Sequence, residues 1–183
     1  MLRRRPPVRA GVAAVEVAVI TAFFLVPLLI GVWEVGRLVQ VQQIVSNSAR
    51  EGARLAGQGV TISSSGTITN VTVSSSSPNV TDTVYQYLLA SGLTTLQKSD
   101  VTIQFQFLTP KLDGTTPTEP YLGEKGETFA LTVTIPWNKV RWINLGVIQP
   151  TTVSFTVTWK MLVDDTFTIN PNLPAPDGAT PTY

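Results

Sequence analysis

A run of seventeen uncharged residues, from Val17 to Trp33, limits what this chain can fold into more than any other feature of its sequence. The run is at the lower limit of what an α-helix needs to cross a bilayer. It becomes long enough with the apolar residues on either side, back to Val12 and on to Val41. Four arginines and no acid lie among the first ten residues. Such a basic flank predicts a single-pass protein with a cytoplasmic N-terminus and an exported C-terminal part.

A cleaved secretory signal peptide is the rival interpretation of this run. Its apolar part would be shorter, and a cleavage site of small residues should follow, whereas residues 31–34 (Gly-Val-Trp-Glu) match such a site poorly. Pro27 lies inside the run, and a proline there removes one backbone hydrogen bond and usually kinks a helix. Gly31 and Gly36 offer small surfaces suited to close helix packing, although glycine is frequent in membrane helices in any case.

Composition narrows the range of functions. The chain has 183 residues, which fits one domain in addition to a membrane segment. Its net charge of +1 conceals nine basic and twelve acidic residues from Gly11 onward, so charge gives no support to nucleic-acid binding. Cysteine and histidine are absent, which excludes thiol and imidazole catalysis and the zinc sites built from those residues. We therefore expect a protein that is not an enzyme and has no metal and no cofactor.

The helix is expected to continue beyond the membrane. Small and apolar residues recur at three- and four-residue spacing after Val41, which is a helical stripe, and Gly57 and Gly59 supply a stop signal. An unbroken helix from Val12 to Ala56 would be roughly 68 Å long at 1.5 Å per residue, so its second half should dock on the exported domain. Glu34 and Arg37 stand one turn apart and can form an ion pair, a modest structural contact worth about 0.2–0.5 kcal/mol to which we assign no chemistry.

The exported part has the pattern of an α+β fold. Residues 79–91 predict a short helix with Asn79 or Thr81 as its N-cap, and residues 67–73 predict a short edge strand. Three later segments, near residues 101–107, 129–135 and 153–161, alternate apolar and polar side chains, as strands of an antiparallel sheet with one buried face do. Both helices are expected to cover that face. On the sheet, the buried residues are expected to include Phe105, Leu131, Val133, Phe155 and Val157, and the helix residues that cover them are expected to be Ile44, Val45 and Leu55. Replacing Phe155 with Ala is expected to lower the free energy of unfolding by about 3–5 kcal/mol.

The remaining segments connect or follow these elements. Residues 109–126 and 138–150 are long connections, and the second carries Trp142, Ile143 and Leu145, which could fold onto the core or form a contact surface. The acids Asp113, Glu124 and Glu127 are expected to be solvated, because their spacing is not that of a calcium loop. The last twenty residues have no periodicity and four prolines, which predicts an extended tail, either disordered or docked on a neighbouring subunit.

The most informative polar residue is Glu16, at the start of the apolar run and five positions after Gly11. A carboxylate at the mouth of a membrane segment costs insertion energy, so its presence indicates a partner.

These residues resemble the N-terminal region of TadE-like proteins, which are minor pilins or pseudopilins of tight-adherence (Tad/Flp-type) pilus systems. The resemblance rests on the basic leader, on Gly11 with Glu16, on the Glu-x-Gly-Arg element at residues 34–37 and on the Ala-Arg-Glu-Gly-Ala-Arg element at residues 49–54. It covers about residues 11–56, under a third of the chain.

The resemblance implies a pilin-like α+β fold and a role in pilus assembly and adhesion. It implies that a prepilin peptidase cleaves between Gly11 and Val12 and that Glu16 acts in subunit assembly. Other pilin or pseudopilin subunits, the Tad secretion machinery and the membrane are the implied partners. The expected location is the inner membrane, with passage into an extracellular pilus left open. We accordingly expect a leader at 1–11, a helix at 12–57, an exported domain at 58–163 and a tail at 164–183.

Cleavage after Gly11 would leave a positively charged α-amine on Val12. That charge is costly in an apolar helical bundle unless it is paired, and Glu16 could neutralise it in its own subunit or in a neighbour. Alternatively, the helix dipole alone favours an acid in the first turn, by about 0.3–1 kcal/mol. For the whole protein, the alternative is a signal-anchored, exported binding or enzymatic domain that never assembles.

Overall fold

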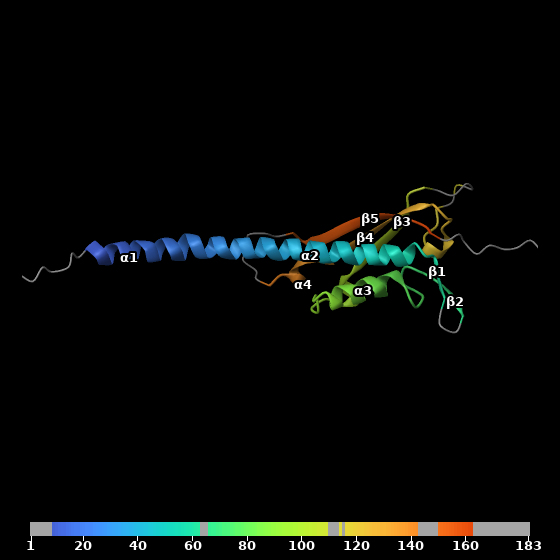
Figure 1. Cartoon of the computed structure of the whole chain (residues 1–183), viewed down its shortest axis with the longest axis horizontal. Helices are drawn as coiled ribbons and strands as arrows, with labels where there is room; N and C mark the ends of the chain where they lie inside the picture. The colour runs from blue at the N-terminus through green and yellow to red at the C-terminus, as the bar shows by residue number, and fades with distance from the viewer. Residues whose placement is uncertain (1–8, 63–65, 110–113, 115, 143–149, 163–183) are drawn as a thin grey trace, which may run out of the picture.

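One helix runs through most of the length of the molecule (Figure 1). The computed structural model describes residues 9–62, 66–109, 114, 116–142 and 150–162. The helix consists of α1 (Arg9–Ile20), the π-helical turn η1 (Thr21–Leu25) and α2 (Val26–Ala56). It therefore begins and ends close to the limits that the sequence predicts.

The π-helical turn ends at Leu25, two residues before Pro27. The N–H of Val26 bonds to the carbonyl of Thr21, five residues back, instead of four. Proline has no N–H to donate, and its ring crowds the carbonyl four residues earlier. A single wide turn at this point is a common way for a helix to continue past such a disruption. The disruption of the helix that Pro27 predicts is therefore present as a π-helical turn.

Three strands form an antiparallel sheet in the order β3-β4-β5, with β3 at Thr102–Phe107, β4 at Thr128–Pro136 and β5 at Thr152–Lys160. Leu131 in the central strand lies opposite Phe105 on one side and Val157 on the other. These pairings place the apolar residues of all three strands on one face, as the two-residue alternation predicts.

The remaining elements are short. Helix α3 spans Val80–Ala90, α4 spans Trp137–Val140, and the 3₁₀ turns η2 and η3 span Lys98–Asp100 and Pro120–Leu122. A separate two-stranded antiparallel sheet pairs β1 (Val60–Ile62) with β2 (Ile68–Asn70). The predicted edge strand at 67–73 is therefore present as β2, but it pairs with β1 and not with the larger sheet. Strand β1 and helix α4 are not among the elements that the sequence predicts.

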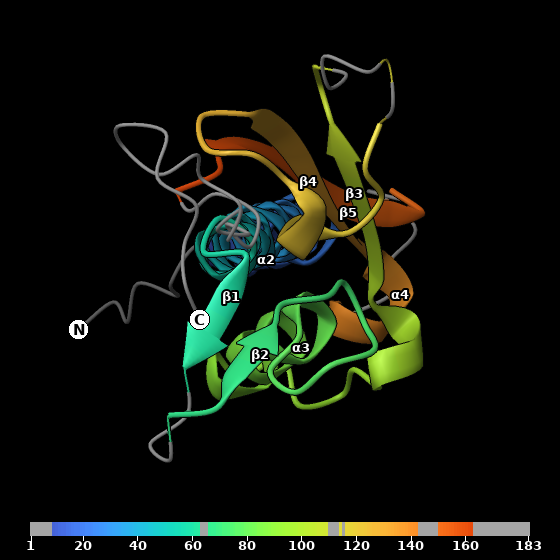
Figure 2. The same cartoon turned by 90° about the vertical axis from the view of Figure 1, so that its right-hand side faces the viewer.

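The second half of α2 lies between the sheet and α3, as the view along the helix shows (Figure 2). Helix α2 packs extensively on α3 and on β5, and also on β4. Val45, Leu131 and Val133 are fully buried, as predicted, whereas Ile44, Phe105, Phe155 and Val157 are only partly buried against the core. The largest fully buried side chain is Trp137. The fold is therefore α+β, with a long helix packed with a short one on a small antiparallel sheet.

Two glycines, Gly57 and Gly59, end α2. Gly57 caps the helix with its N–H bonded to Ala53, and Gly59 has a φ of +65°, a left-handed conformation that glycine adopts readily. A Cβ on Gly57 would also lie 3.0 Å from the Trp159 ring. The helix end that the sequence predicts is thus a turn packed closely against β5.

Candidate functional site

The three residues expected at the processing and assembly site lie together on α1. Gly11, Val12 and Glu16 are all exposed, and Val12 has 58% of its surface accessible. A Cβ built on Gly11 meets no atom within 4 Å. The structure therefore places these residues on one free turn-and-a-half of helix, where another protein can reach them. Their roles in processing and assembly stay predictions.

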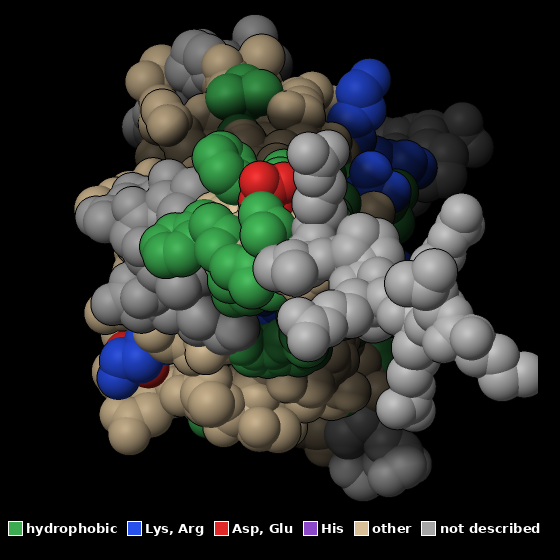
Figure 3. Space-filling view, turned by 90° about the vertical axis from the view of Figure 1, so that its left-hand side faces the viewer, with side chains coloured by type: hydrophobic (Ala, Val, Ile, Leu, Met, Phe, Trp, Pro, Cys, Tyr) green, Lys and Arg blue, Asp and Glu red, His purple; other side chains and the backbone are tan. Residues whose placement is uncertain are grey.

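The first part of the helix projects away from the domain. We name residues 11–33 the apolar segment. Its side chains are exposed almost throughout, and Phe23 reaches 73%. The helix Gly11–Ala56 is long and apolar enough to cross a membrane, with a mean hydropathy of 2.5 in its most apolar window and none of that window buried. Figure 3 faces this end of the molecule, with hydrophobic side chains grouped at its centre and an acidic patch among them.

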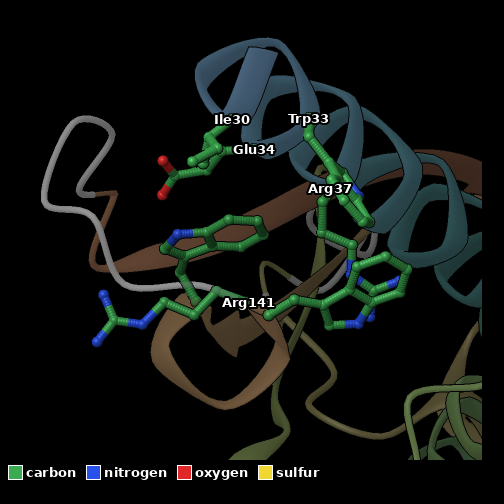
Figure 4. Close-up of a pocket in the computed structure, with 7 residues that line it drawn as sticks. Ile30, Trp33, Glu34, Arg37 and Arg141 are labelled. Carbon is green, nitrogen blue, oxygen red and sulfur yellow. The ribbon is translucent and has the colours of Figure 1, made fainter. Parts of the chain in front are cut away.

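The apolar segment ends where the helix first meets the domain. A cavity with about 20 Å³ of space for a water-sized group lies at this junction, lined by Ile30, Trp33, Glu34 and Arg37 from the helix and by Trp137, Arg141 and Trp142 from the other side (Figure 4). Helix α4 follows β4 directly and brings Trp137 under the long helix. We name these seven residues the junction cluster.

Arg37 joins the two sides of the junction cluster. Its Nε donates to the carbonyl of Val140 at 3.2 Å, and its Nη1 donates to Oε1 of Gln40 at 3.0 Å. The guanidinium carbon lies 4.6 Å from the centre of the Trp142 ring, a cation–π distance, and Trp142 meets Trp33 edge to face at 6.0 Å. Partial burial lowers the pKa of Arg37 below its ordinary value, but an arginine remains charged at neutral pH.

Glu34 is buried in the junction cluster without a partner. It is 6% exposed, and neither carboxylate oxygen has a hydrogen-bond partner among the described residues. The carboxylate points away from Arg37 (Figure 4). The predicted Glu34–Arg37 ion pair is therefore wrong, because Arg37 is held by Val140, Gln40 and Trp142 instead. A buried polar group left unsatisfied costs about 1–3 kcal/mol, and a charged one more.

Trp137 carries a buried hydrogen-bond donor that lacks an acceptor. Its side chain is 1% exposed, and its Nε1–H also has no acceptor among the described residues. Sequence reasoning named neither Trp137 nor the burial of Glu34. The available signal was the position of Glu34 directly after the apolar run, but contact with Trp137 depends on α4, for which the sequence carries no clear pattern.

Charged residues farther along the long helix form an ordinary polar surface. Arg54 makes two hydrogen bonds with Glu51, at 2.6 and 3.0 Å, and this bonding lowers the pKa of Glu51 although burial opposes the shift. Within the described part of the chain, no group of three or more acids is placed to hold a metal ion. Asp113, the tail and the apolar loop residues Ile143 and Leu145 lie outside the described residues.

Asn79 has a structural role. Its side chain is buried, accepts from the N–H of Asp82 at 2.7 Å and caps α3. The prediction that Asn79 or Thr81 caps this helix is thus confirmed for Asn79.

The family model described as TadE-like protein matches residues 11–54. A comparison with curated proteins and with solved structures found no significant match. The family match confirms the resemblance to TadE-like proteins over those residues, which include the whole apolar segment, Glu34 and Arg37. Together with the exposed N-terminal helix, it fits a membrane protein associated with Tad pili.

Proposed function

We propose that this protein is a membrane-anchored minor pilin or pseudopilin of a Tad-type pilus. The apolar segment inserts it into the inner membrane with the N-terminus in the cytoplasm. A prepilin peptidase removes residues 1–11, and the protein then takes part in pilus assembly. The role is structural and not enzymatic.

One observation carries the proposal most directly. The apolar segment is a projecting helix with almost every side chain exposed, and at about 1.5 Å per residue its 23 residues span about 34 Å, enough for the hydrocarbon core. Exposed apolar surface of this extent needs lipid or other protein around it. The match to TadE-like proteins covers the same residues.

Gly11 and Glu16 have different roles in this proposal. Glycine at the scissile bond leaves the backbone accessible to the peptidase, and nothing in the structure crowds it. Cleavage creates the charged amine of Val12. Glu16, four positions later on the same exposed helix, neutralises that amine in its own or an adjacent subunit when the helices pack together.

The test compares three tagged variants in cells, by blotting membrane and sheared pilus fractions and by the intact mass of the extracted protein. Wild type should begin at Val12. Gly11→Val should keep its leader, whereas Glu16→Ala should insert and largely be cleaved but assemble or bind partners poorly. Glu51→Ala, an acid farther along the same helix, is the control and should behave as wild type in processing. Normal processing of Gly11→Val or normal assembly of Glu16→Ala would contradict the mechanism.

A further inference from the structure

The junction cluster contains an acceptor and a donor that no described residue satisfies. Both oxygens of Glu34 and the Nε1–H of Trp137 are buried and lack partners among the described residues. Buried polar groups are normally bonded, and an exception of this kind can mark the place of a ligand. A carboxylate is an acceptor only, so the group that satisfies it must bring N–H or O–H donors.

The cavity indicates the size and charge of that group. Its space of about 20 Å³ suits one water-sized group, such as an ammonium. Three tryptophans line it, and the faces of aromatic rings attract cations. An ammonium meets the needs of Glu34 and of the aromatic rings, and an acceptor attached to it, such as a phosphate oxygen, meets the need of the Trp137 Nε1–H.

The position along the helix indicates where such a cation comes from. If the apolar segment spans the bilayer, as the proposed function requires, then Glu34 lies at the first turn outside the hydrocarbon. Trp33 and Trp142 are 59% and 62% exposed at the same level, and tryptophan is enriched at membrane interfaces among lipid headgroups. The headgroup layer surrounds this site for as long as the chain is in the membrane.

We propose that the junction cluster binds a phospholipid whose headgroup carries a primary ammonium, of the phosphatidylethanolamine type. The ammonium enters the cavity and donates to Glu34. Arg37 has five N–H donors, its two described hydrogen bonds use only two of them, and it lines the same cavity. It therefore offers positive charge to the lipid phosphate.

The chemistry distinguishes this lipid from other common ones. A trimethylammonium headgroup has no N–H to donate and is larger than the cavity. A glycerol headgroup brings hydroxyl donors but no charge to oppose Glu34. A charge-assisted hydrogen bond is the stronger kind, so the preference for a primary ammonium should depend on the Glu34 carboxylate.

The experiment uses the full chain purified in a neutral detergent. Short-chain phosphatidylethanolamine, phosphatidylcholine and phosphatidylglycerol are titrated separately, with binding followed by native mass spectrometry. Wild type should bind the ethanolamine lipid about tenfold or more tightly than the choline lipid, a ratio equivalent to one charge-assisted hydrogen bond. Glu34→Gln should abolish this preference, and Glu51→Gln should keep it. Equal binding of the two lipids by wild type, or an unchanged preference in Glu34→Gln, would overturn the proposal.

Two further measurements distinguish a lipid from a protein partner and test membrane insertion separately. If Glu34 instead receives a lysine or an amine from another copy of the chain, wild type should self-associate without lipid and Glu34→Gln should not, which would overturn the lipid assignment. Carbonate extraction and the N-terminal mass of wild type test the proposed function independently. A protein that is inserted and cleaved but shows no lipid preference contradicts this inference alone, whereas a protein that is not inserted contradicts the proposed function.

Discussion

At the scale of single residues, Gly52 has the tightest surroundings of the glycines on the long helix. A Cβ at this position would lie 2.5 Å from Cγ2 of Val84 and 3.1 Å from Cδ2 of Leu131. Its neighbours Ala49 and Ala53 are fully buried. The Ala-Arg-Glu-Gly-Ala-Arg element therefore places small residues where α2, α3 and the sheet approach one another, and its arginines on the polar side.

Gly52→Ala should destabilise the domain by about 1–3 kcal/mol, because the added methyl group forces the side chains of Val84 and Leu131 to move. Gly36→Ala is the matched control, since nothing lies within 4 Å of a Cβ there and alanine favours helix by up to about 1 kcal/mol. Thermal unfolding of the full chain in detergent, followed by near-ultraviolet circular dichroism, measures both. Equal melting temperatures for the two variants would contradict this packing.

Asp82 gives a pH-dependent contribution at the start of α3. An ion pair with Lys98, followed by a hydrogen bond from Asn79, lowers its pKa below the ordinary value of 3.8. A lowered folded-state pKa means that the stabilisation is fully present above the ordinary value, declines below it and is gone once the pH passes below the folded pKa.

Asp82→Asn should therefore be less stable than wild type near neutral pH, by less than about 1 kcal/mol because the pair is exposed. The difference between the two proteins should shrink as the pH falls below about 3.8 and vanish once the pH passes below the lowered pKa of Asp82 in the folded state. Urea unfolding at a series of pH values checks this. A difference that persists unchanged in acid would show that the Asp82 charge is not responsible.

At the scale of elements, the sequence predicts whatever depends on periodicity. The long helix, α3 and the three strands of the larger sheet follow from spacing that repeats over six or more residues. The short elements do not, because β1 has three residues and α4 has four. Strand β1 pairs across a gap of a few residues, and α4 is held by the burial of Trp137. Tertiary contacts fix such elements, so their sequences carry little signal.

The sheet gives a prediction that corrects the expectation for Phe155. Phe129 is fully buried, in contact with the rings of Phe105 and Phe107, whereas Phe155 is only partly buried. Phe129→Ala should cost about 3–5 kcal/mol, as a buried aromatic does, and Phe155→Ala clearly less. Urea unfolding of the two full-length variants measures the difference. A larger loss for Phe155→Ala would show that the sheet packs differently.

At the scale of the whole molecule, the chain combines an exposed apolar helix with a compact domain on its second half. Sequence alone could predict this division, because charge and hydropathy change sharply along the chain, and the resemblance to TadE-like proteins supplied the candidate residues Gly11, Val12 and Glu16. Neither could predict the junction cluster. Glu34 and Arg37 stand one turn apart, but the opposite wall of their cavity comes from residues about a hundred positions away, and only the fold brings Trp137, Val140 and Trp142 beneath them.

The division predicts a pattern of chemical accessibility along the chain. The protein has no cysteine, so single cysteines can be introduced at residues 24, 42 and 62 of the wild-type chain and at residue 2 of the Gly11→Val variant, which should keep its leader. Each is labelled with a membrane-impermeant maleimide. In intact spheroplasts the exported positions 42 and 62 should react. Position 2 should react only after permeabilisation, because the arginine cluster holds it in the cytoplasm, and position 24 only after detergent removes the lipid around it.

Residues 24, 42 and 62 are all exposed in the protein itself, so protection at residue 24 alone would report the bilayer and not the fold. Labelling of residue 2 in intact cells with protection of residues 42 and 62 would reverse the orientation, and equal labelling at 24, 42 and 62 would show that the helix is not inserted.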